Sequence, residues 1–189
     1  MTRRGWLAAL ALAARGAERE LVEGLATSRV RVVVYEDLQC PDCAAFRVMM
    51  DEKLLPRYGA RVAFLHRDFP LAKHSWARRA AIAARFFTAR DLRWGLDYRR
   101  ETMARLREIT ADTFAARLAA FARARGVDAA AAVAALEDPA LAAAVEKDYQ
   151  EGVARGVART PTAFVNGRPF VETFTFEEIS KGIEEALAE

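Results

Sequence analysis

The stretch that decides the fold is a hydrophobic run followed by a cysteine motif, Val30-Arg31-Val32-Val33-Val34-Tyr35-Glu36-Asp37-Leu38-Gln39-Cys40-Pro41-Asp42-Cys43. Its β-branched first half, residues 30–35, predicts a buried strand that stops at Glu36 and Asp37. Beyond Pro41, apolar residues recur every three or four positions, at Cys43, Phe46, Met50 and Leu54. This spacing predicts a helix with one buried face, which begins at Pro41 and ends near residues 56–59.

A second strand is predicted directly after this helix. Residues 62–65 read Val-Ala-Phe-Leu, and the turn Asp68-Phe69-Pro70 closes the run. A strand, a helix and a strand within about forty residues form a βαβ unit, whose two strands are expected to be parallel and joined by a right-handed crossover.

Residues 73–156 show only helical patterns. Two apolar stripes consist of Trp76, Ala80, Ala83 and Phe87, and of Phe114, Leu118 and Phe121. A further helix is predicted to start with Asp138 as its cap and Pro139 as its first residue. Its inward residues are expected to be Leu141, Val145, Tyr149 and Val153.

The last segment returns to β-structure. Residues 162–165 and 169–171 predict two strands joined at Asn166-Gly167, a pair typical of tight hairpin turns. Thr175 and Glu178 then have the spacing of a capping box for a final helix, buried through Ile179, Ile183 and Leu187.

The chain has only two cysteines, Cys40 and Cys43, so they pair with each other or with none. A disulfide across so short a loop adds little stability, which favours a chemical role. At a helix amino terminus a thiolate is stabilised by free N–H groups and the helix dipole. The apolar spacing predicts that Cys43 is buried and Cys40 exposed, with Cys40 as the attacking sulfur and Cys43 as the resolving one.

A zinc site is the alternative use of two such cysteines, but it needs two more ligands. The only histidines, His66 and His74, fit neither the usual zinc spacing nor one face of a helix. The sequence therefore predicts no metal, and each histidine is interpreted as a capping or packing residue.

The amino terminus has the outline of a secretory signal peptide. Arg3 and Arg4 precede a short apolar run, and small residues follow up to Gly16. The pattern also resembles a twin-arginine export motif. Residues 1–16 are thus interpreted as a signal peptide of the Sec or twin-arginine type, with an amphipathic first helix running through Leu21 and Leu25 as the alternative.

The composition is that of a globular domain. The 189 residues are 53% hydrophobic and 29% charged, which argues against a disordered or low-complexity chain. The net charge is +3, but acidic and basic residues are interspersed. Because no run of basic residues could track a phosphate backbone, no nucleic-acid partner is expected.

Several motifs in a fixed order resemble one known family. They are residues 34–43, Arg67-Asp68-Phe69-Pro70-Leu71, the helical block, and Thr160-Pro161-Thr162-Ala163-Phe164-Val165-Asn166-Gly167. Over residues 28–188 the chain is similar to the DsbA-like thiol:disulfide oxidoreductases of the thioredoxin superfamily. The resemblance implies an α/β thioredoxin-like fold, βαβ then ββα, interrupted by an all-helical insertion. It divides the chain into residues 28–72, a helical insertion at 73–156, and a second half at 157–189.

The resemblance also implies roles for single residues. Cys40 matches the nucleophile and Cys43 the resolving cysteine, while Pro161, preceded by Thr160, matches a cis-proline that offers an edge to the substrate backbone. A cis X-Pro bond is uncommon enough to be a built feature of a fold.

The chain departs from the family pattern at the active-site dipeptide and before the Thr-Pro pair. Pro41-Asp42 replaces the Pro-His of strongly oxidising members, which leaves the direction of electron flow open. Family members often carry Gly just before the Thr-Pro pair, where this chain has Ala158-Arg159. Two interpretations of Arg159 stay open: it faces the Cys40 thiolate, or it points to solvent. Asp37 likewise has two interpretations, as a proton relay for Cys43 or as a cap of its loop.

The expected function is an extracytoplasmic enzyme that exchanges a Cys40–Cys43 disulfide with cysteines of exported proteins, as an oxidase of intermediate strength. It needs no cofactor, and its other partner would be a membrane or soluble redox protein. A DsbA-fold disulfide reductase, cytoplasmic if residues 1–16 are retained, is one alternative. A peptide-binding module with an inert disulfide is the other.

Overall fold

The computed structural model describes residues 20–189, so the expected signal peptide at residues 1–16 lies outside the described residues. In chain order the elements are β1 (Leu21–Gly24), β2 (Arg31–Glu36), α2 (Pro41–Met49), the π-helix η1 (Met50–Leu54), α3 (Leu55–Tyr58), β3 (Ala63–Asp68), α4 (Ala77–Arg90), α5 (Leu92–Ala104), η2 (Leu106–Glu108), α6 (Phe114–Ala124), α7 (Ala129–Ala134), η3 (Ala135–Glu137), α8 (Pro139–Ala154), β4 (Thr162–Val165), β5 (Arg168–Val171) and α9 (Phe176–Ala188).

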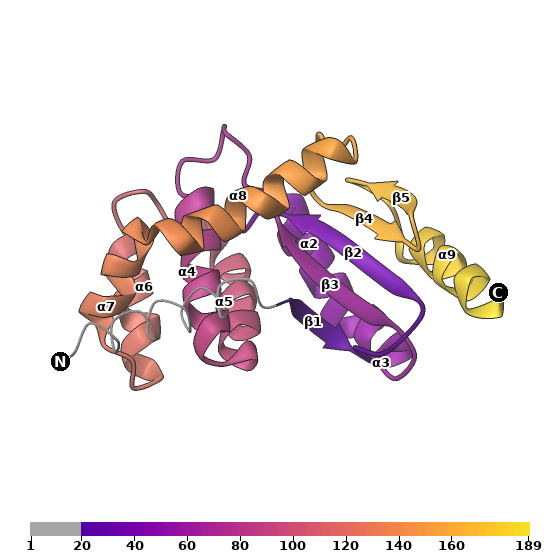
Figure 1. The fold of residues 1–189 in the computed structure, drawn as a ribbon, viewed down its shortest axis with the longest axis horizontal. Coiled ribbons are helices and arrows are strands. Elements are labelled where there is room, and N and C mark those ends of the chain that lie inside the picture. The colour runs from indigo at the N-terminus through magenta and orange to yellow at the C-terminus, as the bar shows by residue number, and fades with distance from the viewer. Residues whose placement is uncertain (1–19) are drawn as a thin grey trace, which may run out of the picture.

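The strands form one five-stranded sheet in the order β1-β3-β2-β4-β5. β2 and β3 are parallel, as the βαβ pattern predicts, and the other neighbours pair antiparallel. Residues of α2, η1, α3 and α9 pack with those of the strands in one hydrophobic cluster on one face of the sheet. The end of α8 crosses the other face, and α4 to α7 form a separate block beside the sheet (Figure 1).

The helix after the cysteine motif is confirmed. It starts at Pro41 and continues through η1 and α3 to Tyr58, so Pro41 occupies a first-turn position where its missing N–H costs nothing. The predicted inward stripe is buried throughout: Cys43, Phe46, Met50 and Leu54 are each at most 3% exposed.

The sequence analysis missed β1, and its alternative of a first helix through Leu21 and Leu25 is wrong. Residues 21–24 instead pair antiparallel with β3, with Leu21 opposite His66. This edge strand has only four residues, and it is held by backbone pairing with a strand that lies about forty residues further along the chain. Its alternation of apolar and polar residues is too short to be recognised in the sequence.

The residues between β3 and β4 are helical, as predicted. Their core is a second cluster that includes Trp76, which stacks on Phe114 with ring centroids 5.9 Å apart. Cys40 and Cys43 belong to the same cluster. The cysteine motif therefore lies where the helical block meets the sheet.

α8 begins as predicted, with the Asp138 carboxylate accepting from the N–H of Ala140 at 2.8 Å. Its expected inward face is wrong at one position, because Val153 is 47% exposed. Gly152 faces inward instead, and a Cβ there would come within 2.7 Å of the Phe69 ring and 2.9 Å of the Tyr35 ring. Without a side chain at this position, α8 can lie directly on the two aromatic rings of the sheet.

The C-terminal predictions are confirmed. The hairpin turn places Asn166 and Gly167 at φ of 43° and 95°, which suits the tight turn between β4 and β5. Thr175 and Glu178 form both hydrogen bonds of the capping box at the start of α9.

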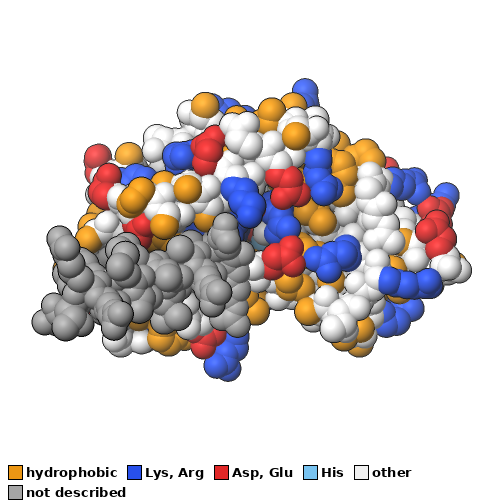
Figure 2. Space-filling view, viewed as in Figure 1, with side chains coloured by type: hydrophobic (Ala, Val, Ile, Leu, Met, Phe, Trp, Pro, Cys, Tyr) orange, Lys and Arg blue, Asp and Glu red, His pale blue; other side chains and the backbone are white. Residues whose placement is uncertain are grey.

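Acidic and basic side chains are interspersed on the face of the molecule shown in Figure 2. Within residues 20–189, no helix is both long and apolar enough to cross a membrane.

A buried cluster of charges joins the helical block to the sheet. Arg99 of α5 donates to Glu36 of β2 at 2.9 Å and also pairs with Asp68 of β3. Arg85 of α4 donates to the same Asp68 at 2.5 Å and pairs with Asp148 of α8. These five side chains are all at most a tenth exposed, so each charge depends on its partners rather than on water.

We expect Arg99→Met to lower the free energy of unfolding by about 3–5 kcal/mol, because two buried carboxylates each lose a cationic partner, which leaves Glu36 with His66 and Asp68 with Arg85. The matched control is Arg78→Met, which removes a half-exposed pair with Glu146 at 2.9 Å and is expected to cost about 1 kcal/mol or less. Urea denaturation of the three proteins measures both values. Equal losses in the two variants would mean that the buried cluster contributes no more than a surface ion pair.

Candidate active site

The cysteine motif starts at the point where β2 gives way to α2. The N–H of Cys40 donates to the carbonyl of Asp37 at 3.0 Å, and the Cys40 carbonyl accepts from the N–H of Ala44 at 3.1 Å. Cys40 is thus the N-cap residue of α2, with φ of −86° and ψ of 124°. Its sulfur lies at the end of the helix where N–H groups are unpaired and the helix dipole is positive.

The prediction that Cys40 is exposed is wrong, although Cys40 is the more exposed of the two cysteines. Cys40 is 5% exposed and Cys43 is fully buried. Cys40 is covered by the loop before β4, where its sulfur lies 3.3 Å from the carbonyl oxygen of Thr160, to which the protonated thiol donates. This contact joins residues 120 positions apart, which no local sequence pattern reports.

The two thiols have opposite pKa shifts. The pKa of Cys40 is lowered to about 6, first by a hydrogen bond from the Cys43 thiol and then, against the effect of burial, by the Thr160 hydroxyl and the backbone N–H groups of Cys43 and Asp42. Burial raises the pKa of Cys43 well above its usual range, and the neighbouring Cys40 and Glu36 add to this. At neutral pH the pair therefore holds a Cys40 thiolate next to a Cys43 thiol.

Asp37 caps the loop through both carboxylate oxygens. One oxygen accepts from the N–H of Gln39 at 2.7 Å, and the other accepts from the N–H of Leu71 at 2.8 Å and contacts Nδ1 of His74 at 2.7 Å. Only its backbone N–H reaches Cys43, 3.4 Å from the sulfur. Of the two interpretations of Asp37, the geometry matches the loop cap.

His66 differs more from its expectation as a capping or packing residue. It lies within β3, fully buried, with Nδ1 2.8 Å from Glu36 and Nε2 2.9 Å from Glu23. The two carboxylates raise its pKa against the effect of burial. The sequence analysis did not predict this row of buried charged side chains next to the cysteine motif, because Glu23 belongs to β1, the strand that it missed. In the described part of the chain, no three His, Cys, Asp or Glu side chains are grouped as a metal site would need.

The peptide bond between Thr160 and Pro161 is cis. The carbonyl of Pro161 accepts from the N–H of Glu172 at 2.7 Å, and the hydroxyl of Thr162 donates to the carbonyl of Arg159 at 2.7 Å. These bonds tie the loop to the end of β5 and to its own strand. The loop thereby presents residues 158–160 beside Cys40.

A cleft of about 440 Å³ opens at Cys40. Its walls come from the start of α2, the turn after β3, the loop before β4 and the end of β5, and they consist of Cys40, Asp42, Leu71, Ala72, Lys73, Ala158, Arg159, Thr160 and Glu172. Arg159 pairs with Glu172 at 2.6 Å and its side chain is 66% exposed, which matches the solvent-facing interpretation of this residue.

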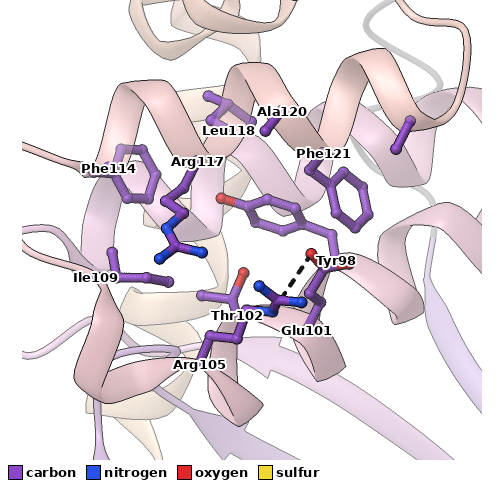
Figure 3. A pocket seen from close by; sticks show the side chains of 11 residues that line it. Tyr98, Glu101, Thr102, Arg105, Ile109, Phe114, Arg117, Leu118, Ala120 and Phe121 are labelled. Carbon is purple, nitrogen blue, oxygen red and sulfur yellow. Dashed lines mark ion pairs between the residues drawn. The ribbon is translucent and has the colours of Figure 1, made fainter.

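A second cavity, of about 140 Å³, lies in the helical block and is lined by neither cysteine (Figure 3). α5 contributes Tyr98 and Thr102, and α6 contributes Phe114, Leu118 and Phe121. The two arginines drawn at this cavity, Arg105 and Arg117, each lie within 4 Å of the carboxylate of Glu108. Its charges are therefore already paired.

The model of the family described as thioredoxin matches residues 17–185. This chain belongs to the thioredoxin family. No curated protein sequence matches it.

Three solved structures are similar in fold to this thioredoxin-family chain. Oxidised BdbD from Bacillus subtilis has a TM-score of 0.78 at 22% identity, over 93% of this chain and 95% of that chain. The thiol-disulfide exchange protein alpha-DsbA2 from Wolbachia pipientis has 0.73 at 18%, over 94% and 97%. The catalytic domain of Proteus mirabilis ScsC has 0.70 at 18%, over the whole of both chains. Since each match spans nearly the full length, the likeness includes the helical block, and the expected DsbA-like thioredoxin fold is confirmed.

The Thr160 hydroxyl is buried and forms no hydrogen bond among residues 20–189, but it lies beside Cys40 and contributes to the lowered pKa of that thiol. We expect Thr160→Val to raise the pKa of Cys40 by about one unit, because a donor to the thiolate is lost while side-chain volume is kept. Thr160→Ser is the matched control and keeps the hydroxyl. Ultraviolet thiolate absorbance against pH measures the pKa, and equal values in the Val and Ser variants would contradict a role of the hydroxyl.

Proposed function

We propose that this protein is an extracytoplasmic thiol-disulfide oxidoreductase that introduces disulfides into exported proteins by exchange with its Cys40–Cys43 disulfide. The observation that carries the proposal is the placement of the two sulfurs. Cys40 lines an open cleft at the amino terminus of α2, whereas Cys43 lies one turn further on and is fully buried. A client can therefore reach one sulfur and not the other.

The exchange proceeds in two steps. A client thiolate attacks the Cys40 sulfur of the disulfide, a client–Cys40 bond forms, and Cys43 leaves and takes up a proton. The second client thiolate then attacks the client sulfur of this mixed disulfide and releases the Cys40 thiolate. The client loses two electrons and the cysteine pair gains them. A redox partner must remove these two electrons before the next cycle.

The pKa values support this division of roles. The stabilised Cys40 thiolate is a good leaving group in the second step, because the leaving thiol departs faster when its pKa is low. The raised pKa of the buried Cys43 keeps the released thiol protonated after the first step. Pro161, which follows Thr160 in the loop over Cys40, would present the backbone edge along which the client lies.

The direction of electron flow follows from how strongly folding stabilises the thiolate. Stabilising the reduced form makes the disulfide a stronger oxidant. Asp42 adds a negative charge in the first turn of α2, which opposes the Cys40 thiolate while it suits the helix end. The stabilisation of the thiolate at the helix end, opposed by the charge of Asp42, supports an oxidant of intermediate strength. Export is supported by the signal-like pattern of residues 1–16.

We expect Cys43→Ala to accumulate covalent mixed disulfides with client proteins, because Cys40 can still attack a client disulfide while no second thiol resolves the product. The matched control, Cys40→Ala, should accumulate few, since its remaining thiol is buried. Non-reducing gels of both variants make the comparison. Equal trapping by the two variants would overturn the assignment of Cys40 as nucleophile.

We expect the Cys40–Cys43 pair to have a redox potential between about −270 and −120 mV, measured by titration with glutathione. A nucleophile pKa near 7 accompanies about −270 mV in thioredoxin and one near 3.5 accompanies about −120 mV in DsbA, and the pKa of Cys40 lies between them. A potential near −270 mV would instead favour the disulfide reductase. A value below about −300 mV would indicate an inert disulfide and leave a peptide-binding module.

A further inference from the structure

The cleft at Cys40 is lined by four ionisable side chains besides the cysteine: two acids, Asp42 and Glu172, and two bases, Lys73 and Arg159. Glu172 and Arg159 form an ion pair at 2.6 Å, so their charges offset each other. The electrostatic field that acts on an incoming client therefore depends mainly on Asp42, Lys73 and the redox state of Cys40.

Asp42 and Lys73 are not equivalent. The carboxylate of Asp42 lies in the first turn of α2, where the positive end of the helix dipole offsets part of its charge. Lys73 lies in the turn between β3 and α4, is exposed, and has no carboxylate within ion-pair distance among residues 20–189. The positive charge of Lys73 is thus offset less by its surroundings than the negative charge of Asp42.

The oxidised enzyme makes this difference larger. In the disulfide, Cys40 carries no charge, so Lys73 faces an approaching client without a nearby thiolate. After the exchange Cys40 is a thiolate and its negative charge is added to the same cleft. The cleft is therefore more positive before the reaction than after it.

We propose that Lys73 determines client specificity, and that the oxidised cleft prefers cysteine segments with acidic side chains next to the reacting cysteine. This inference rests on the proposed function. An acidic segment is attracted to the oxidised enzyme and less so to the reduced one. The charge change at Cys40 therefore favours release of the oxidised client, which agrees with an oxidase rather than a reductase.

The test uses dithiol peptides that are identical except for the residues on either side of the first cysteine, which are Glu, Gln or Lys. The oxidised protein is mixed with each peptide, and the reaction is quenched with acid, alkylated and quantified by mass spectrometry. Because flanking charges also change the pKa of the peptide thiol, each rate is divided by the rate of the same peptide with the small neutral disulfide 2,2′-dithiodipyridine. We expect this relative rate to be about fivefold higher for the Glu peptide than for the Lys peptide at low salt, with Gln between them. The ratio should fall towards one between about 0.01 and 1 M salt, because the charges are exposed.

Variants of Lys73 test whether this side chain causes the preference for the Glu peptide. Lys73→Met should bring the ratio of the Glu to the Lys peptide close to one, and Lys73→Glu should reverse it in favour of the Lys peptide. Lys181→Glu is the matched control, because it makes the same charge change on an exposed lysine of α9 that does not line the cleft, and it should keep the wild-type ratio. Since Lys73 is exposed on a turn, its variants are expected to fold.

Two results would overturn the inference. One is an equal relative rate for all three peptides with the wild-type protein. The other is a higher relative rate for the Lys peptide, which would assign the dominant charge to Asp42. Failure of the proposed function is recognised separately, since a wild-type disulfide that even the neutral dithiol dithiothreitol does not reduce would not be redox-active. A disulfide that dithiothreitol reduces at once, but that shows no preference among the peptides, would leave the proposed function standing and remove only the role of Lys73.

Discussion

The structure depends on Asp68, a buried carboxylate at the end of β3 that is held between two arginines of the helical block. Arg85 and Arg99 reach it from α4 and α5, and they extend the cluster to Asp148 of α8 and Glu36 of β2. Such a cluster tolerates few arrangements, because each buried charge needs its partner in hydrogen-bond geometry. It thereby fixes where the helical block sits on the sheet, a task that apolar packing alone performs with less directional precision.

The position of the block decides the shape of the site. Between Asp68 and α4 the chain runs through a turn whose residues Leu71 and His74 bind the Asp37 carboxylate. Asp37 in turn belongs to the loop that leads into Cys40, and its N–H reaches the Cys43 sulfur. One carboxylate therefore couples the turn after β3 to the cysteine motif, so that the cleft wall and the nucleophile keep their relative position.

The sequence was sufficient wherever the deciding interaction is local. The apolar stripe from Cys43 to Leu54, the caps at Asp138 and Thr175 and the Asn166-Gly167 turn each involve residues within a few positions of one another, and all are confirmed. The predictions that were wrong or missing depend on distant residues. β1 pairs with β3 through the backbone, Thr160 covers Cys40, and Glu23 and His66 meet across two strands. Neither hydrophobic periodicity nor capping preference carries information on such pairings.

The two cysteines show how far a fold can separate identical groups. They lie one helical turn apart, yet burial and hydrogen bonding move their pKa values in opposite directions. That difference comes from the burial of Cys43, from its hydrogen bond to Cys40, and from the donors at the helix amino terminus and in the loop above it. The client, however, meets three further cleft walls, which come from the turn after β3, the loop before β4 and the end of β5. The first two of these segments are the points where the chain enters and leaves the helical block. Substitutions there can change which clients are bound while the helix end that activates Cys40 stays the same, so client choice and thiol chemistry can vary separately in this fold.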